Sequence, residues 1–341
     1  MPFPLIPVAV IAASSLSAFY GMFKGAKAIA KATRAKNINE QAERILSDAQ
    51  EKALTARNEA QECISEFGRI KLGVLEGSVR RFVDVFEKIH NIDLENSVGL
   101  DELSKYHIDK QSVLELRNMS VLAVEALTGL LGATGAGALA AFGAYGATMT
   151  FASASTGTAI ATLSGIAAKN ATLAFLGGGA LAAGGGGMFL GTIVLGSLVA
   201  GPALIVLGIA FDAAAQKNLE KALGDLAKAR VTAEQLSTVG VACVGIARRS
   251  SMFSKLLREL DTIFVTLISQ LEFIVSARGT DYAQYSEYEQ KRVAMAVSLA
   301  GAIKRILDTP ILDTKGGLTR QSELTHAEMI AYKGKLKAEL N

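Results

Sequence analysis

Residues 188–211 read MFLGTIVLGSLVAGPALIVLGIAF, and this stretch decides the fold class of the chain. It closes a block, residues 126–211, in which Lys169 is the one charged residue among 86. An apolar helix of about 20 residues crosses a bilayer, so each half of the block is long enough for about two crossings, or for one crossing and a re-entrant piece. The block therefore predicts a glycine-rich, transmembrane-capable hydrophobic hairpin.

Glycine is concentrated in the same block, which holds 19 of the 33 glycines. A glycine in a helix in water costs about 1 kcal/mol relative to alanine. In lipid, small residues let helices approach closely. We therefore expect helix packing at Gly187, Gly191, Gly196 and Gly201. We expect membrane insertion of the large apolar side chains of the block: Leu130, Leu131, Phe142, Phe175, Met188, Phe189, Ile193, Val194, Leu195, Leu198, Val199, Leu204, Ile205, Val206 and Leu207.

The N-terminus offers a second apolar element, because residues 1–23 carry no charged side chain. Basic residues follow this run instead of preceding it, so we expect no cleavable signal peptide. Three arrangements of residues 8–23 stay open: a membrane crossing with the basic side cytoplasmic, a helix in the interface, or a helix packed on the bundle. We expect the following basic residues to contact anionic lipid: Lys24, Lys27, Lys31, Arg34 and Lys36.

The regions on either side of the block show helical periodicity. A stripe of 11 apolar or small residues from Ile38 to Val74 recurs every 3.6 positions, the period of a straight helix, and predicts one helix over residues 37–90. Residues 219–274 repeat the pattern, and residues 108–125 predict a helix leading into the block. The charged runs at 34–71 and 217–259 read as solvated faces. After a break at 278–281 we expect a helix over 282–307, and then a short peripheral helix opened by a capping box of Thr325 and Glu328.

These patterns together predict an all-α chain: an elongated helical bundle, or coiled-coil-like rod, with the hydrophobic hairpin. The expected divisions are 1–36 (apolar segment and basic cluster), 37–120 (long helix and connecting helix), 121–211 (membrane-inserting hairpin), 212–310 (amphipathic helices) and 311–341 (polar tail with a short helix).

Motifs of catalysis are absent from the sequence. It contains three His and two Cys, without HExxH, CxxC or GxSxG, and its glycine-rich stretches lack the Lys-Ser/Thr of a phosphate loop. We therefore expect no enzyme, no metal site and no cofactor. The formal net charge of +3 and the lack of an aromatic stacking platform argue against nucleic-acid binding. Cys63 and Cys243 lie on apolar helical faces and are predicted to be buried, reduced thiols.

The segment GGGALAAGGGGMFLGTIVLGSLVAGPAL, residues 177–204, resembles the hydrophobic hairpins of apolipoprotein L-like and related bacterial proteins. Long helices around such a hairpin resemble α-helical pore-forming proteins of the cytolysin A type. The resemblance covers residues 115–215 in pattern, but this block is longer and richer in glycine than a cytolysin head, and we expect no export signal. The resemblance implies a soluble form with a shielded hairpin that then inserts and assembles.

The hydrophobic block and its flanking helices are compatible with two functions. The first is a membrane-inserting helical protein, synthesised in the cytoplasm, that oligomerises and permeabilises a bilayer as a toxin-like or pore-forming effector. The alternative is a membrane-anchored scaffold without pore activity, whose helices recruit a partner such as a membrane-remodelling GTPase. The expected partners are the lipid bilayer, further copies of the chain, and a protein bound through the amphipathic helices.

Overall fold

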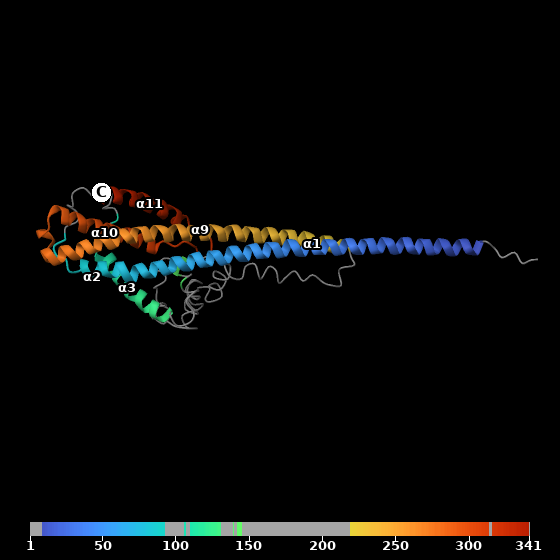
Figure 1. Cartoon of the computed structure of the whole chain (residues 1–341), viewed down its shortest axis with the longest axis horizontal. Helices are drawn as coiled ribbons and strands as arrows, with labels where there is room; N and C mark the ends of the chain where they lie inside the picture. Colours follow the sequence, from blue (N-terminus) through green and yellow to red (C-terminus); the bar gives the residue numbers. More distant parts are fainter. Residues whose placement is uncertain are drawn as a thin grey trace, which may run out of the picture. The chain divides into compact units, whose positions relative to one another are not determined.

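The computed structural model describes residues 9–92, 106, 110–130, 139, 142–144, 219–313 and 316–340 (Figure 1). Helices dominate this part of the chain, which contains no β-strand. Its β-type pairing is confined to two isolated bridges, His90 with Asp281 and Leu312 with Leu318. The predicted all-α class is therefore confirmed for the described residues.

Two helices are much longer than the others. Helix α1 has 66 residues and α9 has 60, about 100 and 90 Å at 1.5 Å per residue. The described elements are α1 (Ala9–Val74), the π-helix η1 (Leu75–Val79), α2 (Arg80–Phe86), α3 (Lys110–Leu130), α9 (Leu219–Arg278), the 3-10 helix η6 (Tyr282–Gln284), α10 (Glu287–Asp308) and α11 (Arg320–Leu340).

Helix α1 differs from its prediction at both ends. It begins at Ala9, so the N-terminal apolar segment and the amphipathic stripe belong to one helix, and no break occurs at residue 37. Its α-helical geometry is interrupted after Val74 by η1 and resumes in α2, so the helical run ends at Phe86, four residues before the predicted end at residue 90. The stripe itself is confirmed, because each of its 11 members is buried or half-buried. The periodicity thus identified the buried face correctly, but it missed the early start of the helix and the π-helical interruption.

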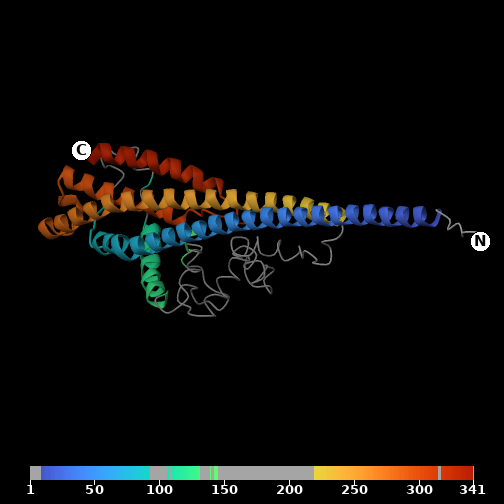
Figure 2. The same ribbon diagram turned by 45° about the vertical axis from the view of Figure 1, so that its right-hand side comes forward.

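The chain divides into two units, and the first comprises residues 1–55 and 202–240. In it, Ala42 of α1 packs with Leu226 and Ala229 of α9, and further along both helices Ala53 packs with Leu236. Residue numbers rise together along the two helices, so α1 and α9 are parallel neighbours here (Figure 2). Small alanine side chains at the contact allow the helices to lie close together. Leu223 belongs to the apolar pattern predicted over residues 219–274, but it is 50% exposed.

The second unit comprises residues 56–201 and 241–341 and contains an aromatic core. Phe67 of α1 meets Phe253 of α9 edge-on, with ring centroids 5.7 Å apart. Helix α10 is buried along most of its length, and the hydroxyl groups of Ser298 on α10 and Tyr332 on α11 lie 3.0 Å apart. Burial raises the pKa of Tyr332, so this hydroxyl stays protonated and can donate.

Helix α11 corrects the prediction of a short peripheral helix. It has 21 residues, begins at Arg320, and buries Met329 and Leu336. Thr325 is buried inside the helix instead of capping it. The backbone N–H of Ser322 donates to the Thr319 hydroxyl at 3.1 Å, as expected of an N-cap.

A capping box is present at α10, where none was predicted. The Ser286 side chain accepts from the Glu289 backbone, and the Glu289 carboxylate accepts from the Ser286 backbone at 2.8 Å. We expect Ser286→Ala to lower the free energy of unfolding by about 1 kcal/mol, because the Ser286 hydroxyl is the acceptor for the otherwise unpaired backbone N–H of Glu289. Urea unfolding tests this against Ser276→Ala, an exposed serine within α9. Equal stability of the two variants would contradict the assigned cap.

Candidate functional site: the docked segment of the uncharged block

Part of the uncharged block lies directly against α1. Leu139 and residues 142–144 are helical and form what we call the docked segment. A Cβ built on Gly68 would lie 2.0 Å from the Leu139 carbonyl oxygen, and one built on Gly143 would lie 2.0 Å from the Ile64 carbonyl oxygen. The two backbones therefore touch, in a reciprocal antiparallel contact that tolerates only glycine at both positions.

Main-chain hydrogen bonds hold the end of the docked segment. The carbonyl oxygen of Ala144 accepts from the N–H groups of Ile311 and Leu312, at 2.8 and 3.1 Å. Both donors lie between α10 and α11. Phe142 and Ala144 are each 3% exposed, so the docked segment is part of the core of this unit.

Lys71 is buried at the same contact. Its Nζ donates to the Phe142 carbonyl at 3.2 Å and lies 4.6 Å from the centroid of the Phe67 ring. Burial lowers the pKa of Lys71 to about 7, although the negative charge of Asp308 opposes this. A pKa lowered from 10.5 to about 7 corresponds to at most about 5 kcal/mol for keeping the ammonium buried. Docking thus places a poorly solvated amine beneath the segment, and the interpretation of residues 34–71 as a solvated face is wrong for Lys71.

Helix α3, which leads into the block, is tied to its neighbours by two ion pairs. Glu115 lies 3.0 Å from Nζ of Lys304, which also contacts Asp308 at 2.6 Å. Arg117 lies 2.8 Å from Glu87, just beyond α2. The side chains of Leu116 and Met119 are buried. The entry to the block is therefore anchored in the same unit as the docked segment.

The π-helix η1 directly follows the part of α1 that contacts the docked segment. It packs against α3, and its Ser78 hydroxyl bonds the carboxylate of Asp261 on α9. Short π-helical turns within α-helices are frequent at functional sites. Gly73 and Gly77, unlike Gly68, face open space, so neither is required by a close contact. This π-helix was not predicted. A π-helical turn contains one residue more than an α-helical turn, and the apolar stripe with its 3.6-residue period ends at Val74, before that turn begins.

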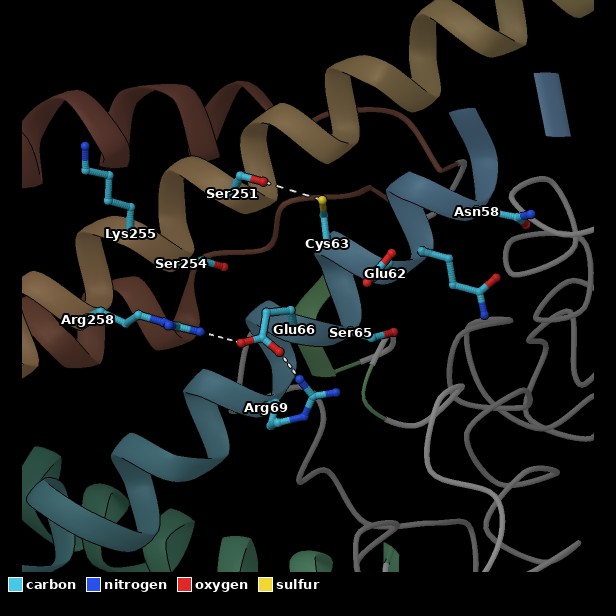
Figure 3. A pocket seen from close by; sticks show the side chains of 11 residues that line it. Asn58, Glu62, Cys63, Ser65, Glu66, Arg69, Ser251, Ser254, Lys255 and Arg258 are labelled. Atoms are coloured by element: carbon cyan, nitrogen blue, oxygen red, sulfur yellow. Dashed lines mark hydrogen bonds and ion pairs between the residues drawn. The ribbon is translucent and has the colours of Figure 1, made fainter. Parts of the chain in front are cut away.

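A groove of about 910 Å³, lined by polar and charged residues and Cys63, lies between α1 and α9 in this unit (Figure 3). Glu66 pairs with both Arg69 and Arg258, and the Ser251 hydroxyl approaches the Cys63 thiol at 3.5 Å. The charge of Glu66 is thus paired across the groove. Within the described part of the chain, no group of three or more His, Cys, Asp or Glu side chains could hold a metal ion.

Only some of the predicted site residues lie within the described part of the chain. Leu130 ends α3, and Phe142 belongs to the docked segment. Leu131, Phe175, the predicted inserting residues from Met188 to Leu207, and the glycines at 187, 191, 196 and 201 lie outside the described residues. Lys24 and Lys27 lie on α1, and Lys31, Arg34 and Lys36 are exposed on it.

The two cysteines have different environments. Both thiols are free, and Cys243 is buried as predicted. Burial raises the pKa of Cys243. Cys63 is only half-buried and lines the groove, so its predicted burial is wrong.

By length and composition, one helix among the described residues, α9, could cross a membrane. Core helices of soluble proteins meet the same criterion, and a third of this apolar stretch of α9 is buried. No family model, curated protein or solved structure matches the chain.

Proposed function

We propose that this chain is a membrane-inserting helical protein that oligomerises and permeabilises a bilayer, and that the docked segment holds the front of the uncharged block until release. The observation that carries this proposal is the contact of Gly68 with the docked segment above the buried Lys71. The contact consists of small residues and main chain, which can pack equally well on other small-residue helices in lipid. Release also returns Lys71 to water, which offsets part of the lost packing.

The basic residues of α1 support an approach to anionic membranes. Lys31, Arg34 and Lys36 are exposed, and Lys36 is only loosely paired with Glu40, at 3.9 Å. Each Lys or Arg near an anionic surface contributes roughly 1 kcal/mol. Binding of this kind would bring the uncharged block to the bilayer before insertion.

The test is release of an encapsulated dye from anionic liposomes by detergent-free protein, beside a variant lacking residues 126–211. We expect leakage from the intact chain alone. If the intact chain co-floats with the liposomes and releases nothing, permeabilisation is contradicted and the membrane-anchored scaffold becomes the better proposal.

Single acidic substitutions test insertion of the block. Leu195→Asp or Val206→Asp would each cost about 2.5–3.5 kcal/mol at the centre of a bilayer. We expect dye release to fall roughly 100-fold in either variant. The matched control is Leu54→Asp, which changes a 49% exposed leucine on α1 outside the block. Full dye release by both block variants would contradict the placement of Leu195 and Val206 in the membrane.

A further inference from the structure

We propose that Lys71 is a proton-operated latch: the docked segment leaves α1 together with uptake of a proton by the Lys71 amine. This inference rests on the proposed function, because it assigns the regulation of the same contact. A neutral amine can satisfy the Phe142 carbonyl, 3.2 Å away, with one N–H. Protonation would place a full positive charge at this buried position beside the rings of Phe67 and Phe142, 4.6 and 5.7 Å from Nζ, and burial disfavours the charged form.

The charged groups near Lys71 and its burial have opposite effects on its pKa. Asp308, at the end of α10, attracts its proton. Asp308 is shared with Lys304, which also pairs with Glu115 of α3. The described residues of the docked segment carry no ionisable side chain, and Ile311 and Leu312 contribute backbone N–H groups to the dock. Burial therefore outweighs the attraction of the Asp308 carboxylate.

The direction of the pH effect follows from the two states of Lys71. In the docked state its pKa is lowered to about 7, whereas after release the amine has its ordinary value of 10.5. Between these values the released state binds more protons, so docking strengthens as pH rises from about 7 to 10.5. Below about pH 7 both states are protonated, and this group adds no further dependence. An anionic membrane surface concentrates protons and attracts the freed ammonium, so it favours release.

The measurement is hydrogen exchange of the full chain without lipid, read by mass spectrometry on peptides covering residues 139–144 and corrected for the intrinsic effect of pH. We expect protection to rise roughly 100-fold between pH 7 and 9.5 in the unmodified chain. Lys71→Met should show high protection without this slope. Lys255→Met, which changes an exposed lysine of α9, should keep the slope.

A second variant covers the case in which Lys71→Met does not fold. Lys71→Arg keeps a permanent charge, so its docked segment should exchange rapidly at every pH. The latch is overturned by a flat profile in the unmodified chain, or by an unchanged slope in Lys71→Met or Lys71→Arg. Because no membrane is present, this result is separable from dye release: leakage without the slope removes the latch alone, and the slope without leakage removes the proposed function alone.

Discussion

Gly68→Ala is expected to expel the docked segment from α1. The added methyl group would lie 2.0 Å from the carbonyl oxygen of Leu139, and both atoms at the clash are fixed to helical backbones. Relief requires the helices to separate, which forfeits the packing of Phe142 and the Lys71 hydrogen bond. We expect a loss of about 3 kcal/mol from docking. Exchange of residues 139–144 should accelerate by roughly 100-fold, and dye release from anionic liposomes should become faster.

Gly73→Ala is the matched control on the same helix. A Cβ at Gly73 meets nothing within 4 Å, so the substitution should only improve helix propensity, by about 1 kcal/mol. Equal exchange in the two variants would show that the close contact does not hold the segment. Faster exchange without faster dye release would separate docking from membrane activity.

Phe253→Ala is expected to destabilise the second unit by about 3–5 kcal/mol, the range for removing a buried aromatic ring. Phe253 is fully buried, meets Phe67 of α1 edge-on, and lies 5.6 Å from the ring of His326 on α11. Its removal leaves a cavity shared by three helices. Urea unfolding of the full chain, followed by circular dichroism, measures the loss.

The same substitution at Phe273 controls for composition and helix propensity. Phe273 also lies on α9 but is 71% exposed. We expect Phe273→Ala to change the free energy of unfolding by no more than about 0.5 kcal/mol. Similar losses in both variants would mean that the exposed ring is covered in solution, and the assignment of the core around Phe253 would be wrong.

The helices were predictable because their signal is repeated. All 11 residues of the stripe on α1 fit the same period. A single buried charged residue on this helix, such as Lys71, therefore does not change the helix prediction. The cap of α11 depends on one local motif, and Thr325 with Glu328 matches the Thr-x-x-Glu pattern, whereas the true cap, Thr319, is followed three positions later by Ser322. Local motifs of four residues recur within helices by chance, whereas a stripe of 11 does not.

The contact between the docked segment and α1 could not be predicted from the sequence. Gly68 is an isolated glycine in a helical pattern, and Gly143 is one of 19 in the block. Their roles exist only where two segments 75 positions apart meet. The burial of Lys71 likewise depends on Phe142 lying above it. Contacts that use backbone atoms leave little pattern in side-chain chemistry, and only the assembled structure reveals them.

The pairing of α1 with α9 has a consequence for biosynthesis. Phe67 and its partner Phe253 are separated by 186 positions, which a ribosome adds in about 10 to 40 s. During that interval the nascent α1 lacks Phe253 as its partner, and the whole uncharged block is synthesised within the same interval. The second unit can therefore close only after the whole block has been synthesised. If the block inserts as proposed, insertion competes with the folding of this unit while the chain is still on the ribosome.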